Sequence, residues 1–176
     1  MSDDAVGLPS GQLVLAEHHP AWAAAFAAEA AAVRTALGER ALAVEHIGST
    51  AVPGLLAKPV VDIGVAVGSV ADAEAAVAPL EARGYAHRGM HGDDPARRYF
   101  VLDRGGRRVF QLHLYVVPAP AWERHLAFRD LLRARPDLAA AYAREKRRVA
   151  GATGWDKGAY SLATGPFIER VLRELP

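Results

Sequence analysis

The sequence predicts an α/β fold of the α+β kind, in which a mixed β-sheet is flanked by helices and covered by a C-terminal helical cap. Three observations indicate this fold. An apolar run rich in β-branched residues at 59–67 is typical of a strand buried on both faces. Two alternating segments, 98–103 and 107–117, flank a glycine turn. From residue 121 onward the chain has the pattern of successive helices.

The length and composition favour one globular domain that covers residues 1–176. A chain of 176 residues can bury its own hydrophobic core, and 23% charged residues are typical of a globular surface. The chain has no cysteine, which excludes disulfides, thiolate zinc sites and cysteine nucleophiles and leaves histidine and carboxylates as metal ligands. A net charge of +1 gives no strong field, so nucleic acid is not an expected partner.

The sequence shows neither a secretion signal nor a membrane-spanning run. Asp3 and Asp4 stand where a signal peptide would carry basic residues. Charges such as Lys58 and Asp62 interrupt each apolar run before it reaches membrane-spanning length. We therefore expect a cytoplasmic protein without a membrane partner, and the sequence does not indicate its oligomeric state.

Helices and strands alternate in the first part of the chain. Apolar residues at helical spacing predict an amphipathic helix over 20–37. The weak alternation of 42–47 predicts a strand, which ends where Gly-Ser and Pro-Gly turn chemistry begins. The central strand at 59–67 follows. The next segment, 70–83, is predicted to be one helix that ends before Gly84.

The remainder of the chain is predicted as a hairpin followed by helices. A short strand near Tyr85 leads into a flexible polar loop at 89–96. The hairpin follows, with its turn at 104–106. A break at Pro136 separates the first two of the final helices. These helices are expected at 122–135, 137–149 and 161–175.

A glycine and a serine at the end of a strand are the first candidate for a ligand site. At Gly48 and Ser49 the backbone could approach a ligand closely, and its N–H groups and the hydroxyl could hold a phosphate oxygen, although such a pair also occurs in ordinary turns. Asp62 stands in an otherwise apolar strand, and a buried carboxylate needs a cation, a metal or several donors. Alternation places Asp62 on one strand face with Gly64, which leaves space beside it. The structural alternative is an ion pair with Lys58 or a nearby arginine.

The second strand of the hairpin supplies further candidates. Its alternation places Gln111, His113 and Tyr115 on one face. A strand histidine is commonly structural. Close to Asp62 and His46, however, His113 would complete a set of nitrogen and oxygen donors for a divalent metal.

Two adjacent segments form a distinctive pattern, HIGSTAVPGL at 46–55 and AKPVVDI at 57–63. This pattern closely resembles the signature of the GrpB family, whose members occur alone or fused behind dephospho-CoA kinase. The chain lacks the P-loop of a kinase and resembles the standalone kind. Further family-like positions extend over nearly the whole chain: Trp22, Phe26, Gly84, Tyr85, Arg98, Phe100, His113, Leu114, Phe128, Arg129, Asp130, Tyr142, Lys146, Tyr160, Phe167 and Ile168.

The GrpB family is similar in fold to the nucleotidyltransferase superfamily. In that superfamily a Gly-Ser pair precedes a strand with two alternating carboxylates, which hold magnesium against a nucleotide. Asp62 matches the first carboxylate, but Gly64 stands at the second position. The third falls near Gln111 or His113, neither of which is acidic, and alternation points Glu45 away from the loop. The chain therefore departs from the donor set of two-metal transfer.

The resemblance and the residue pattern together imply roles for named side chains. The catalytic candidates are Asp62, His113 and His46. The candidate ligands of a Mg²⁺ cofactor are Asp62 and His113. The candidates for binding a phosphate or another anion are Gly48, Ser49, Thr50, Lys58, Arg98, Arg129 and Lys146.

Three functions are compatible with these assignments. The first is a nucleotidyltransferase-like enzyme that moves a nucleotidyl group from a nucleoside triphosphate to a small acceptor. The second is a binding domain without catalysis, for a nucleotide or a coenzyme A-related ligand. The third is an acid–base or single-metal enzyme that acts on a small polar metabolite. The basic residues around 144–148 favour a solvated helix face over nucleic-acid binding.

Overall fold

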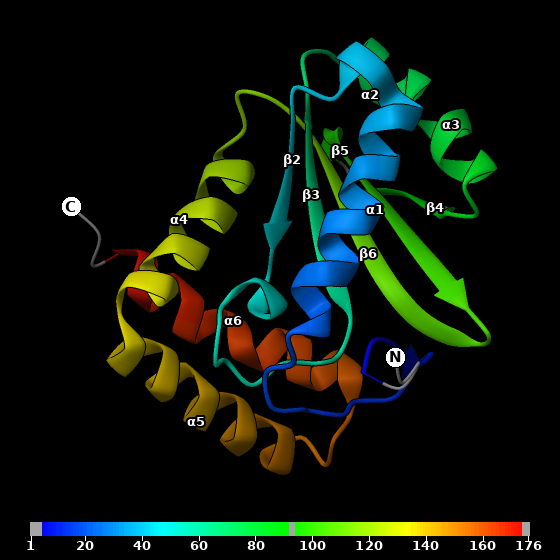
Figure 1. Cartoon of the computed structure of the whole chain (residues 1–176). Coiled ribbons are helices and arrows are strands. Elements are labelled where there is room, and N and C mark those ends of the chain that lie inside the picture. The colour runs from blue at the N-terminus through cyan, green and yellow to red at the C-terminus, as the bar shows by residue number, and fades with distance from the viewer. Residues whose placement is uncertain (1–4, 92–93, 174–176) are drawn as a thin grey trace.

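The computed structural model describes residues 5–91 and 94–173, and a mixed β-sheet lies at its centre (Figure 1). The order of the strands across the sheet is β2-β3-β6-β5-β4, and β1 pairs with β6. The β3–β6 pair is parallel and the other pairs are antiparallel. The strands are β1 (Leu8–Pro9), β2 (Ala43–Ile47), β3 (Val61–Val67), β4 (Ala86–His91), β5 (Asp94–Arg104) and β6 (Arg107–Val116).

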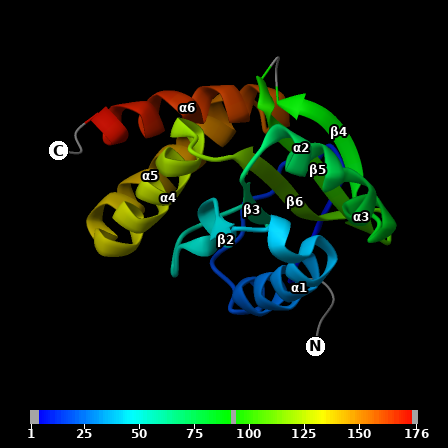
Figure 2. The same ribbon diagram turned by 90° about the horizontal axis from the view of Figure 1, so that it is seen from above.

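Helices lie on both sides of this sheet. Figure 2 shows α1 on one side and α6 on the other. Helices α1, α2 and α3 cover the side that we call the closed face, and α4, α5 and α6 form the expected C-terminal cap over the other side, the open face. The helices are α1 (Ala21–Leu37), α2 (Val70–Ala75), α3 (Val77–Ala82), α4 (Pro120–Ala134), α5 (Pro136–Ala152) and α6 (Lys157–Arg173), and η2 (Ser49–Ala51) is a short 3₁₀ turn. Every helix in the described part of the chain is too short or too polar to cross a bilayer.

The main hydrophobic core lies on the closed face. In β3, Val61, Ile63 and Val65 are fully buried there, where they pack with apolar side chains of β6 and with Trp22 of α1. Because neighbouring residues of a strand point to opposite faces, the residues between these valines and isoleucine face the C-terminal cap. Asp62 and Gly64 therefore belong to the open face.

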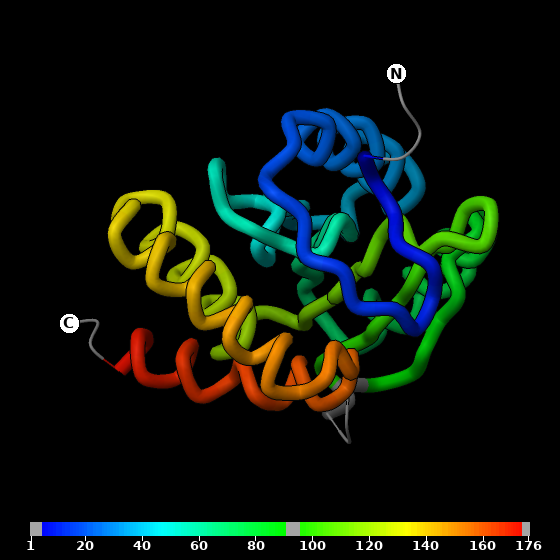
Figure 3. The backbone as a smooth tube through the Cα atoms, turned by 90° about the horizontal axis from the view of Figure 1, so that it is seen from below, coloured from blue at the N-terminus to red at the C-terminus, as the bar shows by residue number. Residues whose placement is uncertain are grey.

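The segment before α1 runs across the end of the molecule that faces the viewer in Figure 3, and it hydrogen-bonds to the chain that precedes β3. The Gly7 amide donates to the Pro59 carbonyl at 2.6 Å, and Ala16 exchanges backbone hydrogen bonds with Ala57. These contacts hold the chain that leads into β3. The start of β3, where Asp62 stands, is consequently fixed from outside the sheet.

The expected single helix at 70–83 is two short helices, which corrects the prediction. Helix α2 ends at Ala75 and α3 begins at Val77. Pro79 has no N–H to donate to the carbonyl of Ala75, so the regular hydrogen-bond ladder cannot run through this point.

The expected polar loop at 89–96 is also wrong where the structure describes it, and residues 92 and 93 lie outside the described part of the chain. Strand β4 continues to His91 and β5 begins at Asp94, so most of this segment is sheet. Its polar composition fits an edge strand, because β4 ends the order of strands. A register shift lies between His87 and Met90, where Gly89 adopts φ +84°.

Candidate functional site

The candidate site forms where β2 ends beside the beginning of β3. Ile47 pairs with Asp62, and the next residue, Gly48, adopts φ +71° and turns the chain away from the sheet. A Cβ at Gly48 would lie 2.5 Å from Oδ2 of Asp62. Only glycine therefore allows the loop to pass so close to the carboxylate, and the same turn leads directly to Ser49 at the start of η2.

Asp62 lies near the start of β3 and is partly exposed, which corrects the expectation of a buried carboxylate. It is the second residue of β3, and 26% of its side chain is exposed. Its Oδ1 lies 3.8 Å from Nε2 of His113 on the adjacent β6. Gln111 lies on the same face, because it pairs with Asp62 in register.

A cavity of about 200 Å³ opens beside Asp62, and we call it the lysine cavity. It receives side chains from the loop after β2, from β3 and β6, and from α5 and α6. The lining residues that matter below are Ser49, Lys58, Asp62, Gln111, Tyr142 and Lys146. The structure thus brings much of the predicted anion site together around one space.

Lys146 is the most deeply buried charged group of the lysine cavity. The residue is 2% exposed, and its Nζ donates to Ser49 Oγ at 2.5 Å and to the Leu56 carbonyl at 2.7 Å. Burial lowers the pKa of Lys146 to about 7; Lys58 lowers it further and Asp62 opposes the change. The ammonium is therefore held against the serine of the loop, close to its protonation midpoint at neutral pH.

The space expected beside Gly64 is filled, which corrects another prediction. A Cβ at Gly64 would lie 2.8 Å from Cζ3 of Trp122 and 3.2 Å from Cγ2 of Ile47. Trp122 of α4 thus occupies the place where a second carboxylate would project. Among the described residues, no group of three or more His, Asp or Glu side chains could hold a metal ion. One carboxylate and one imidazole do not fit a centre of two magnesium ions.

His46 lies on the closed face, so its expected grouping with Asp62 and His113 is wrong. Its ring stacks on Phe26 with 4.6 Å between centroids, and its Nε2 lies 3.0 Å from Oγ1 of Thr50. Burial is the main cause that lowers the pKa of His46 to about 4, so the ring is neutral at pH 7. Thr50 lines the lysine cavity, but its hydroxyl is engaged by His46. His46 therefore stabilises the loop through its contact with Thr50, from the closed face of the sheet.

Arg98 also lies on the closed face, away from the predicted anion site. In register it pairs with Leu114, whereas its neighbour Tyr99 pairs with His113 on the open face. Arg98 is buried, and its Nη1 donates to the Arg97 carbonyl. The expected ligand role of Arg98 is therefore not supported, because its side chain lies on the face of the sheet opposite to Asp62 and the lysine cavity.

Arg129 has a different part from the one expected, since its guanidinium ties α4 to the end of β2, directly before the loop. Nη1 donates to Glu45 Oε2 at 2.8 Å and to the His46 carbonyl at 3.0 Å, and Nε donates to Asp130 at 2.7 Å. Glu45 does share the open face, because it pairs with Gly64 in register. Its carboxylate is used by Arg129 and adds no ligand beside Asp62.

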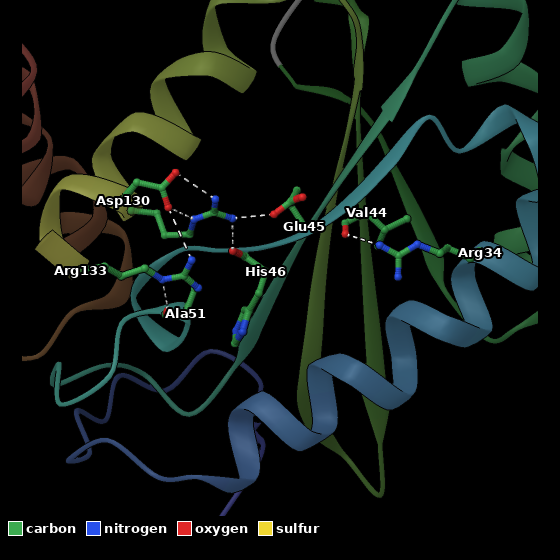
Figure 4. Close-up of polar contacts among 8 residues, drawn as sticks. Arg34, Val44, Glu45, His46, Ala51, Asp130 and Arg133 are labelled. Atoms are coloured by element: carbon green, nitrogen blue, oxygen red, sulfur yellow. Dashed lines mark hydrogen bonds and ion pairs between the residues drawn. The ribbon is translucent and has the colours of Figure 1, made fainter.

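A second arginine of α4 holds the other end of the same loop. Arg133 Nε donates to the Ala51 carbonyl at 2.9 Å (Figure 4). The carbonyls of His46 and Ala51 flank Gly48 and Ser49 in the chain, so α4 fixes the loop on both sides of the glycine and serine. Both arginines therefore act as positioning residues of the loop.

A larger cavity of about 350 Å³ lies among α4, α5 and α6, and we call it the helix cavity. Its walls include His125, Phe128, Tyr142, Ile168 and Leu172. Phe128, Tyr142 and Ile168 were noted only as family-like positions, and none of the five was predicted to line a cavity. Burial lowers the pKa of His125 to about 4, and its Nδ1 lies 3.3 Å from the Tyr115 hydroxyl. The sequence carries no local signal for this cavity, because it depends on how three helices pack together.

Comparison with known proteins agrees with this architecture. A solved structure of the conserved protein GrpB from Enterococcus faecalis superimposes with a TM-score of 0.76 and 32% identity, over 90% of this chain and 99% of that one. A structure of Cid1 poly(U) polymerase gives a TM-score of 0.51 at 15% identity, over 74% of this chain and 40% of that one. The second similarity shows a shared fold alone.

Relatives in sequence include longer proteins. A UPF0157 protein of Pseudomonas aeruginosa is 41% identical over 156 residues, which cover 87% of this chain. A dephospho-CoA kinase of Mycolicibacterium paratuberculosis is 34% identical over 166 residues, 80% of this chain and 40% of that one. The chain spans 63% of the Pseudomonas protein and 41% of a UPF0157 protein of Bacillus subtilis. The model of the GrpB protein family matches residues 12–174, and the chain belongs to the GrpB family.

Proposed function

We propose that this protein binds a phosphate-bearing small ligand at the Gly48–Ser49 loop and that this binding does not require magnesium. The observation that carries the proposal is the contact of Lys146 Nζ with Ser49 Oγ, 2.5 Å apart, at the wall of the lysine cavity. A phosphate oxygen beside Ser49 would accept hydrogen bonds from both groups. The nucleotidyltransferase-like fold agrees with such a ligand.

The charges around the cavity support an anionic ligand. A buried ammonium is unfavourable unless an opposite charge compensates it. The acceptors that hold Lys146 are an uncharged hydroxyl and an uncharged carbonyl. Lys58 adds a second positive charge to the same cavity, in which Asp62 is the acidic side chain among the described lining residues. A bound phosphate would restore the balance of charge.

Binding is favoured over nucleotidyl transfer by the arrangement around Asp62. In-line transfer with two metal ions needs acidic ligands for both metals. Trp122 fills the space at Gly64, and Arg129 engages Glu45. The two-magnesium centre of the related superfamily would lack a second acidic ligand here. The basic residues of the lysine cavity would compensate the charge of the ligand instead.

The test is calorimetric titration with inorganic pyrophosphate, in EDTA and again with Mg²⁺. We expect binding in EDTA. Lys146→Met should weaken it by about tenfold or more, because a hydrogen bond to a charged group contributes roughly 1.5–3 kcal/mol. The matched control is Arg147→Met, which removes an exposed charge from the next position of α5. Coenzyme A-related phosphates are useful further probes, since a dephospho-CoA kinase is among the relatives.

Two results would contradict ligand binding that does not require magnesium. One is a titration without detectable heat in EDTA that gains a binding signal only when Mg²⁺ is added. The other is release of pyrophosphate from a nucleoside triphosphate in the presence of an acceptor, which would identify the protein as a transferase. An equal loss of affinity in both variants would show that net charge, and not the contact with Ser49, determines binding.

A further inference from the structure

The helix cavity adjoins the lysine cavity, because Gly48, Ser49 and Tyr142 line both of them. The proposed phosphate site uses only the smaller space of about 200 Å³, and the adjoining 350 Å³ remains without an assigned role. Together they have the size of a pocket for a metabolite rather than for a single ion. A ligand held by its phosphate at Ser49 would therefore project into the larger space.

The walls of the helix cavity are mainly apolar. Side chains from three helices form them: Phe128, Leu132, Tyr142, Ile168 and Leu172. Two aromatic rings stand at an angle, since those of Phe128 and Tyr142 lie 5.3 Å apart with their planes at 83°. Tyr142 is buried and also stacks on Phe167, with 5.0 Å between centroids, whereas Phe128 is partly exposed. The ring of Phe128 is therefore the aromatic surface that this cavity offers to a bound aromatic group.

Most charged groups of the helix cavity are already compensated within the protein. Arg124 pairs with Glu169 at 2.6 Å, and Arg129 is held by Glu45 and Asp130. Arg97, the remaining charged residue among those that line the cavity, lies over the ring of Tyr115. The lysine cavity shows the opposite arrangement, since its two lysines face one carboxylate. The two spaces are thus suited to chemically different parts of one molecule.

Building on the proposed function, we infer that the ligand is bipartite: its phosphate group lies in the lysine cavity and a flat apolar body, of the aromatic-ring class, lies in the helix cavity. The loop at Gly48 and Ser49 stands at the junction of the two parts. Tyr142 lines both cavities. Its ring packs against Lys146 of the lysine cavity, with Nζ 4.5 Å from the ring centroid, and against Phe128 of the helix cavity. The shape of the site therefore selects phosphoesters by their body as well as by their charge.

A glycine in the wall allows the helix cavity to be narrowed by mutation. Gly165 lines this cavity, and a Cβ added there meets no heavy atom within 4 Å. Gly165→Leu should therefore fold, and a leucine is favourable within a helix such as α6. Gly151 in α5 provides the matched control, since its Cβ position is equally open and it lines neither cavity.

The experiment compares phenyl phosphate with methyl phosphate, which differ in the body and not in the charged group. Dissociation constants are measured by NMR titration in EDTA for the unmodified protein, Gly165→Leu and Gly151→Leu. We expect phenyl phosphate to bind about tenfold more tightly than methyl phosphate. Gly165→Leu should remove most of this preference, and Gly151→Leu should keep it.

The outcomes separate the inference from the proposed function. Equal affinities of the two esters, in a protein that binds pyrophosphate, would overturn the bipartite ligand and leave the phosphate site standing. A preference for phenyl phosphate that Gly165→Leu does not reduce would also overturn it, because the aromatic body would then lie elsewhere. Failure of pyrophosphate and of both esters to bind would overturn both ideas together.

Discussion

The two faces of the sheet use the same strands for different purposes. On the closed face, alternate residues of β3 and β6, such as Ile63 and Leu112, are fully buried against α1, α2 and α3. On the open face, the residues next to them in sequence, Asp62 and Gln111, line the lysine cavity. The difference shows how a sheet can separate its stabilising core from a cavity, because neighbouring residues of one strand make contacts on opposite faces.

The strongest test of this separation compares adjacent residues of β6. Leu112→Ala should destabilise the fold by about 2–5 kcal/mol, since it removes buried methyl groups from the core and leaves a cavity. Gln111→Ala, on the partly exposed open face, should change the free energy of unfolding by less than about 1 kcal/mol. Urea denaturation measures both. Similar losses in the two variants would show that the open face is part of the stabilising core.

A smaller loss of stability is expected at Gly64, where Trp122 of α4 packs on the open face. Gly64→Asp should destabilise the protein by about 1–3 kcal/mol, because the new side chain meets the ring of Trp122. In the double variant with Trp122→Ala, the added carboxylate should be less unfavourable than in the single variant. A double-mutant cycle on unfolding free energies measures this coupling. Additive effects would mean that Trp122 is not what excludes a carboxylate at this position.

The third effect is the smallest when it is expressed per pH unit: Lys146 should make the free energy of unfolding depend on pH. Its pKa is lowered from 10.5 to about 7, so between these values the unfolded chain binds a proton that the folded chain lacks. The contribution to stability therefore rises with pH through this window, by at most about 1.4 kcal/mol per pH unit, and the destabilisation is complete below pH 7. The free energy of unfolding should change more between pH 7 and pH 9 in the unmodified protein than in the Lys146→Met variant.

The two tyrosines of the lysine cavity titrate above this pH window. Tyr160, which shares the lysine cavity, has its pKa raised by burial to about 12, and that of Tyr142 is raised further. Subtracting the Lys146→Met variant removes contributions from the rest of the chain. Parallel pH profiles for the two proteins would mean that the lysine is protonated as freely in the folded state as in the unfolded one.

Elements with local signals could be predicted from the sequence. The hairpin between β5 and β6 was recognised from its glycine turn, and Gly105 and Gly106 do adopt positive φ angles of 56° and 74°. The apolar run of β3 and the helix boundary at Pro136 were equally clear. These features depend on residues close to one another in the chain, so no knowledge of the tertiary structure was needed.

The candidate site was predictable only in part, for a physical reason. The contact of Gly48 with Asp62 follows from two segments that are close in sequence. His46, in contrast, was assigned to the same cluster, because alternation within one strand does not indicate which face the next strand presents. Register between strands decides that, and so does the packing of Trp122 into the space at Gly64. Neither leaves a local pattern.

The loop between β2 and β3 is attached to α4 and α5, so it depends on the C-terminal helices for its position. Arg129, Arg133 and Lys146 all come from the second half of the chain, yet they fasten residues 46–56 of the first half. A fragment that ends before α4 would retain the strands and lose these fastenings. The lysine cavity is therefore complete only when the C-terminal helices are packed against the sheet, because α5 and α6 also supply part of its lining.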